Sequence, residues 1–168
     1  MLTWPAHLVT VLMVASTAVL IAAALHDIVA RTAPNWMAAT LSTFGLVIQA
    51  IHGQLLIALL VGLIVFTVSA FCWRRGWMGG GDVKLLAAAA IVVSPSHAVI
   101  FVAAVAIAGA VSALIYLVGS RIVSAPVVQR PTHLLSRALR IERWRIRRAG
   151  PLPYALAIAS GFLFITVL

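Results

Sequence analysis

The chain has 168 residues, of which 64% are hydrophobic and only 9% are charged. A soluble domain carries roughly 25% charged residues, so this composition excludes an ordinary water-exposed surface and predicts a membrane protein. In a chain this apolar, the net charge of +9 indicates membrane topology and contacts with anionic lipid, and we expect no nucleic-acid partner. The length suits one integral-membrane domain over residues 1–168, and the single cysteine, Cys72, excludes a disulfide framework.

Six apolar stretches, separated by short polar breaks, predict an all-α bundle of six transmembrane helices. In chain order the stretches are 4–25, 36–51, 55–72, 83–93, 98–118 and 152–168. The fourth stretch is short, because its eleven residues rise only about 16 Å, roughly half the thickness of the hydrocarbon layer. A helix that begins earlier, near Trp77, would relieve this shortfall.

The basic residues test this topology independently. All twelve lysines and arginines fall in alternate loops, around residues 31, 74–84 and 121–148, and the intervening loops and both ends have none. The positive-inside rule therefore predicts that these three loops are cytoplasmic and that both termini lie outside. Eight cations lie in the segment 119–150. We expect this segment to contact anionic lipids between Arg121 and Arg148, with an interfacial helix over 132–148, although a docking surface for partner proteins is the alternative.

The chain contains three acidic residues, and two of them, Asp27 and Asp82, lie at boundaries of apolar stretches. A carboxylate at mid-bilayer is unfavourable by about 2.5–3.5 kcal/mol on insertion scales, so one that is retained indicates function. Asp27 ends the first predicted span and Asp82 begins the fourth, which places both at the cytoplasmic side. Two adjacent carboxyl groups hold one proton between them. The ionised member can deprotonate a water molecule while the protonated member donates to a substrate carbonyl, which is the chemistry of aspartic proteases and requires no metal or cofactor.

Three glycines precede the second aspartate, in the order Gly79, Gly80, Gly81, Asp82. Glycine permits positive φ and close backbone approach, so we expect this run to shape a site in which an extended peptide pairs with backbone beside the carboxylate. The structural alternative is a loop that feeds a helix, with Asp82 as its N-cap.

The other charged residues near these boundaries have open roles. Asp27 could pair with Arg31, four residues further on. Lys84 could neutralise a carboxylate, reach a substrate carbonyl or extend to the membrane interface. Glu142, the third acid, is expected to pair with a nearby arginine and not to take part in catalysis.

Residues 79–84 resemble the GxGD element of the type IV prepilin peptidases, a family of membrane aspartyl proteases. The stretch 27–36, in which Asp27 is followed by a basic turn and Pro34-Asn35, resembles the family's first aspartate. Residues 153–159 resemble its Pro-Tyr-Gly segment, with Ala155 in place of glycine. The resemblance implies that Asp27 and Asp82 are the catalytic pair.

The same resemblance implies a substrate and a location. It implies cleavage of a prepilin leader at the cytoplasmic face of the bacterial inner membrane, generally after a glycine that precedes the pilin's apolar helix. The chain is similar to the short, peptidase-only form associated with Flp pili and tight-adherence systems. Two other readings stay open: a small proton-coupled transporter in which the aspartates relay protons, and a non-catalytic assembly subunit of a pilus or secretion machine.

Overall fold

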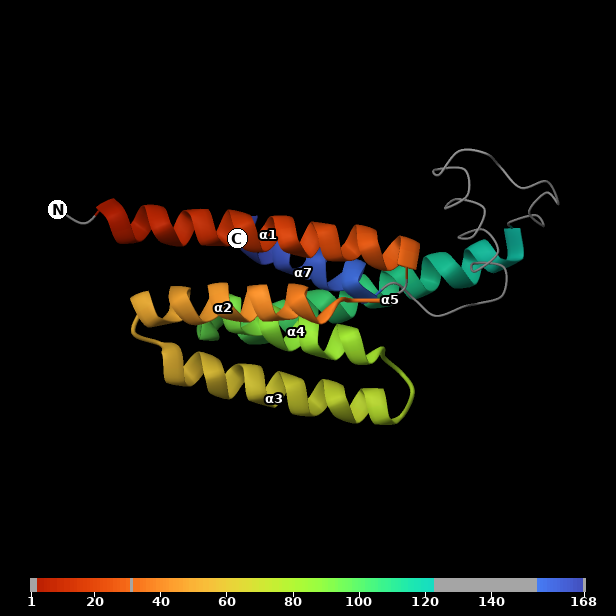
Figure 1. Cartoon of the computed structure of the whole chain (residues 1–168). Coiled ribbons are helices and arrows are strands. Elements are labelled where there is room, and N and C mark those ends of the chain that lie inside the picture. The colour runs from red at the N-terminus through yellow and green to blue at the C-terminus, as the bar shows by residue number, and fades with distance from the viewer. Residues whose placement is uncertain (1–2, 31, 123–153, 168) are drawn as a thin grey trace.

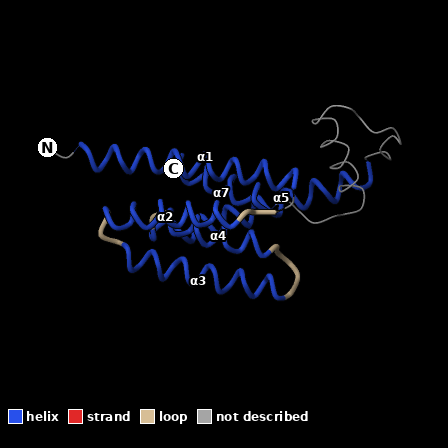
Figure 2. Tube along the Cα trace, in the orientation of Figure 1, coloured by secondary structure: helices blue, strands red, loops and turns tan. Residues whose placement is uncertain are grey.

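The computed structural model describes residues 3–30, 32–122 and 154–167. These residues form six α-helices and one short 3-10 helix and contain no strand (Figure 2). The helices are α1 (Thr3–Ala30), α2 (Asn35–Ile51), α3 (Leu55–Arg74), α4 (Gly80–Val92), α5 (Ala98–Ile122) and α7 (Tyr154–Val167), with η1 (Pro95–His97) before α5. The predicted all-helical fold is confirmed. The predicted interfacial helix over 132–148 lies outside the described residues.

Three segments are long and apolar enough to cross a membrane: Trp4–Ala30, Leu55–Arg74 and Pro95–Ile122. The helices α2 and α7 are apolar but shorter, and α4 has only 13 residues. Such a helix rises about 20 Å, which is less than the roughly 30 Å of the hydrocarbon layer. Three spans are thus supported by length and composition, and six crossings stay a prediction.

Two helix boundaries differ from those expected. The first helix continues to Ala30, so Asp27 lies inside α1 and not in a polar turn. Between Asp27 and Pro34 the sequence has no proline or glycine that would break the helix. The residue before a proline disfavours helical backbone, so α1 must end before Pro34. The fourth helix begins at Gly80, three residues earlier than the apolar pattern suggested.

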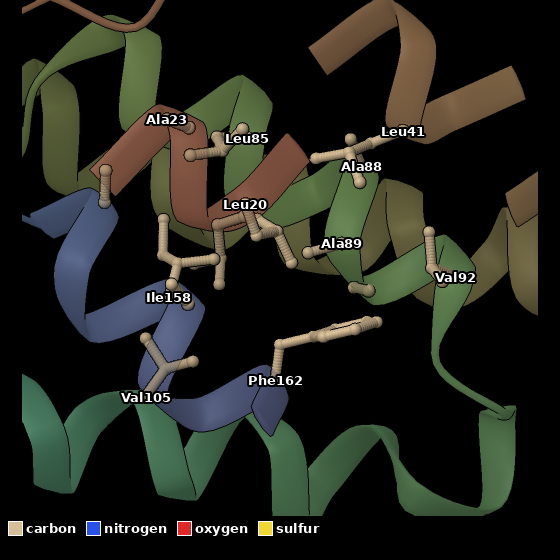
Figure 3. Packing of buried hydrophobic residues seen from close by; sticks show 14 of the residues in the cluster. Leu20, Ala23, Leu41, Leu85, Ala88, Ala89, Val92, Val105, Ile158 and Phe162 are labelled. Atoms are coloured by element: carbon tan, nitrogen blue, oxygen red, sulfur yellow. The ribbon is translucent and has the colours of Figure 1, made fainter. Parts of the chain in front are cut away.

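The helix α4 lies in the interior of the bundle, where it contacts α2, α3 and α7, while α7 also packs against α1 and α5 (Figure 1). Its residue Leu85 belongs to the same buried core as Ala23 of α1 (Figure 3). Phe101 of α5 and Phe162 of α7 are fully buried and meet edge to face, with ring centroids 6.4 Å apart. Apolar side chains cover the outside as well as the core, as expected of a surface that faces lipid.

The alternation of helix directions gives the bundle two distinct ends. The C-terminal turns of α1, α3 and α5 and the first turns of α2, α4 and α7 meet at one end, which we call the aspartate end (Figure 1). All the described cations lie there: Arg74, Arg75, Lys84 and Arg121. The opposite end holds the turns at 52–54 and 94–97 and the N-terminal end of α1, and α7 runs toward it (Figure 1). The described charges are therefore segregated to one end, as a positive-inside topology requires.

Candidate active site

Asp27 lies on the buried face of α1, near the aspartate end. The positions 20, 23, 24 and 27 follow the i, i+3, i+4, i+7 spacing of one helix face, and all four residues are buried. Asp27 retains only 5% of its exposure. The carboxylate is therefore held inside the bundle, one turn beyond Ala23, whose side chain meets the core (Figure 3).

Asp82 lies in the first turn of α4 and is half-buried. The N-cap is Gly79, so Asp82 is the third helical residue and not the cap itself. Its face continues through Leu85, Leu86 and Ala89, which are buried. The carboxylate also lies near the positive end of the helix dipole, which favours an anion there.

The two aspartates lie on helix faces that share one core. Ala23 of α1 and Leu85 of α4 belong to the same cluster of buried residues, and both are labelled in Figure 3. From these two anchors, Asp27 lies one turn further along α1 and Asp82 lies one turn back along α4. Because the two helices run in opposite directions, both steps lead to the aspartate end (Figure 1).

The glycine run packs closely against its surroundings. A methyl group added at Gly81 would lie 2.9 Å from the Cβ of Ala33 and 3.1 Å from its carbonyl oxygen, so the turn after α1 presses on the first turn of α4. One added at Gly80 would lie 3.2 Å from the indole nitrogen of Trp73. The run therefore allows the turn that follows Asp27 to approach the helix that carries Asp82.

This close approach, and not positive φ, explains the glycines. The positive-φ glycines of the described chain are Gly53 and Gly76, which lie in turns on either side of α3. Gly79 has φ −72° and ψ 144°, and the next two residues are helical. Of the two properties of glycine expected to matter here, close approach is found and positive φ is not, because side-chain volume is what the contact excludes. At Gly79, an added methyl would lie 2.7 Å from Oδ2 of Asp82, so this carboxylate folds back over the N-cap.

Lys84 lies on a different face of α4 from Asp82, because residues two apart in a helix do not face each other. Its Nζ donates a hydrogen bond of 2.9 Å to Oδ1 of Asn35, the first residue of α2. The ammonium is thus held by a neutral amide, which joins the segment after the first aspartate to the helix of the second. Arg31, the possible partner of Asp27, lies outside the described residues.

Two further residues near the site received no role from the sequence. Tyr154 begins α7 and is half-buried, and its phenol lies within electrostatic range of the Asp82 carboxylate and the Cys72 thiol. Asn35 holds Lys84. Both follow a proline at the start of a helix, and that shared pattern at the aspartate end is the signal that could have identified them. The described residues contain no cluster of three or more His, Cys, Asp or Glu placed to hold a metal ion.

Comparison with known proteins gives one match. The model of the Type IV leader peptidase family matches residues 14–114, which is more than half of the chain and includes both aspartates and the glycine run. None of the curated proteins and none of the solved structures compared with the chain matches it.

Proposed function

Because the chain belongs to the type IV leader peptidase family, we propose that it is a membrane-embedded aspartyl endopeptidase that removes the leader peptide of a type IV, Flp-like prepilin. Asp27 and Asp82 are the proposed catalytic pair. The observation that carries this assignment is their placement: both lie on faces of antiparallel helices that share one core, at the same end of the bundle. The close contact between Gly81 and Ala33 supports it, because it brings together the segments that follow and precede the two aspartates.

The proposed chemistry uses one proton shared by the two carboxyl groups. The ionised aspartate takes a proton from a water molecule, whose oxygen attacks the carbonyl carbon of the scissile amide. The protonated aspartate donates its proton to the carbonyl oxygen and so stabilises the developing oxyanion. Collapse of the tetrahedral intermediate returns that proton to the carboxylate pair, and the leaving amine takes the proton abstracted from water. The two aspartates thereby recover their starting protonation state.

The buried polar residues argue for a peptidase and against a transporter. A proton-coupled carrier needs polar groups along several spans. Ser16 and Ser69 instead donate to the carbonyls of Leu12 and Val65, one turn back in their own helices. Gln49 donates to the end of α4. These polar side chains are thus used locally and do not form a path between the two ends of the bundle.

The family supports a prepilin substrate, and the placement of the charges supports a membrane face. All the described cations lie at the aspartate end, which supports a cytoplasmic active site in the bacterial inner membrane. There the enzyme would meet a prepilin before export, with the pilin's apolar helix in the bilayer and its leader in the cytoplasm. Anionic lipids are the proposed partners of the basic segment 119–150, and pilus assembly proteins are the alternative.

The test uses the three acids as a matched set. The chain is expressed with a panel of candidate prepilins, and leader removal is measured by mass spectrometry of the pilin. Asp27→Asn and Asp82→Asn should each lower the cleavage rate by about 10²- to 10⁴-fold while membrane levels stay normal. Glu142→Gln, the same change at the remaining acid, should cleave as the wild type does. Normal cleavage in either aspartate variant would refute the proposal, and failed pilus export with normal leader removal would indicate an assembly subunit.

A further inference from the structure

A groove of about 490 Å³ lies on the opposite side of α4 from the aspartates. Three helices line it, and each contributes four residues: Asn35, Ala38, Ala39 and Ser42 from α2; Leu59, Gly62, Leu63 and Phe66 from α3; Lys84, Ala87, Ala88 and Ile91 from α4. On every helix the spacing is i, i+3, i+4, i+7, which is one face over two turns. The groove is therefore a cleft two helical turns long, about 10 Å, between α2 and α3, with α4 as its floor.

The groove has a polar mouth and an apolar body. Lys84 and Asn35 lie at its mouth, at the aspartate end, and are exposed. Below the mouth, the α2 wall consists of small side chains such as Ala39, and the floor contains two alanines and Ile91. The α3 wall has large apolar groups such as Leu63 on either side of Gly62. Small residues let a further helix approach closely, and a face of i, i+3, i+4, i+7 anchors is how an apolar helix fills a groove.

We propose that this groove receives the apolar helix of the prepilin substrate, an inference that rests on the proposed function. The first argument is continuity, because Lys84 at the mouth follows Asp82 by two residues on the same helix. A peptide that leaves the groove must cross one helix diameter, about 10 Å, to reach the carboxylate, which takes about three extended residues. The scissile bond then lies about three residues before the substrate's helix begins.

Charge gives the second argument. Within the described chain, Lys84 is held by the neutral amide of Asn35, so the groove mouth keeps a positive charge. An extended peptide has free backbone carbonyl oxygens at this point, whereas inside the substrate's helix the carbonyl oxygens already accept hydrogen bonds. The ammonium is placed to donate to them. The occupant thus has a polar, extended end at Lys84 and an apolar helix below it, as a prepilin has around its cleavage point.

Two adjacent hydroxyl residues of α2 make a matched test. Ser42 lines the groove and Thr43 does not, yet both hydroxyls donate to the carbonyl four residues earlier in the helix. The probe is a synthetic peptide with a short basic leader that ends in glycine, followed by about 18 apolar residues. With purified protein in liposomes, Ser42→Phe should raise KM about tenfold or more and leave kcat within about twofold, because it removes ground-state and transition-state binding equally. Thr43→Phe should match the wild type.

A photo-crosslink locates the peptide directly. In the Asp82→Asn background, p-benzoylphenylalanine replaces either Leu63, which lines the groove, or Leu60, which is exposed but lies outside it. The peptide should label the first position about tenfold more than the second, and an unlabelled peptide that includes the apolar helix should compete. Equal labelling, no peptide adduct, or adducts with lipid alone would overturn the proposal.

The outcomes separate the two proposals. A wild-type chain that leaves the peptide intact would refute the proposed function, and the groove's role with it. A wild-type chain that cleaves the peptide while Ser42→Phe retains its KM would refute only the groove, and the aspartates would keep their role.

Discussion

Replacing Gly81 by alanine tests whether the contact between the turn after α1 and the first turn of α4 sets the position of Asp82. The added methyl would lie 2.9 Å from the Cβ of Ala33, 3.1 Å from its oxygen and 3.2 Å from its nitrogen. Carbon atoms in contact are normally about 3.5–4.0 Å apart. Two of the three atoms belong to the backbone, so no side-chain rotation relieves the overlap. The two segments must therefore separate by about 0.5–1 Å.

The stability effect should be small, because two terms oppose each other. Overpacking is unfavourable by about 1–3 kcal/mol, whereas alanine is favoured over glycine in a helix by up to about 1 kcal/mol. The activity effect should be larger. A displacement of about 1 Å among reacting groups can lower the rate about 10²-fold. Gly81→Ala should therefore lower kcat by about 10- to 100-fold and lower Tm by less than about 8 °C.

The assay measures kcat, KM and Tm on the purified protein in liposomes or detergent, with the cleavable prepilin as substrate. The control is Gly109→Ala in α5, where the nearest atom to the new methyl is the Cβ of Ala157 at an ordinary 3.9 Å. That variant should keep wild-type kcat. If Gly81→Ala also keeps it, the Ala33 contact does not set the active geometry, and the link drawn between the glycine run and catalysis is wrong.

Four further substitutions, in three experiments, give separate readouts. Gln49→Leu removes the amide that donates to the last carbonyls of α4. It should lower the free energy of unfolding by about 1–3 kcal/mol in a denaturation experiment. An unchanged midpoint would show that these hydrogen bonds do not stabilise the fold. Gly161→Ala places a methyl 2.9 Å from the backbone nitrogen of Val105, so it should lower Tm and folded yield while kcat per folded molecule stays normal; a loss of kcat alone would contradict this. Lys84→Met and Asn35→Ala should each raise KM by about 2- to 10-fold. Both changes remove the same hydrogen bond, so the double variant should raise KM no more than the stronger single change does. Additive effects would refute that coupling.

Several features of this fold are predictable from sequence because they depend on local properties. Apolar length gave the order and type of the helices, and the twelve cations in alternate loops gave their directions. Those directions alone place Asp27 and Asp82 at one end of a bundle. Asp27 is buried and Asp82 is half-buried. Both lie on core faces because the helical period of α1 and of α4 continues past their apolar residues.

Other features depend on packing between distant segments and could not be predicted in this way. The polar residues from His26 to Asn35 suggested a turn, but α1 continues to Ala30, because a polar side chain such as that of Asp27 does not end a helix when its neighbours bury it. The glycines at 79–81 suggested unusual backbone, whereas their role comes from Ala33 and Trp73, which approach from other segments. The groove likewise exists only because α2, α3 and α4 meet in a particular register.

The short length of α4 is explained by its position in the interior of the bundle. Its 13 residues are too few for a lipid-exposed helix that crosses the bilayer. That minimum length applies to a helix whose end groups must reach water, and not to one whose end groups are hydrogen-bonded by protein. Protein surrounds α4, and most of its residues are buried. At its C-terminal end, Nε2 of Gln49 lies 3.2 Å from the carbonyl oxygens of Ile91, Val92 and Val93 and caps them inside the bundle. The protein therefore satisfies this end of α4 inside the bundle, and Asp82 lies in the first turn at its other end.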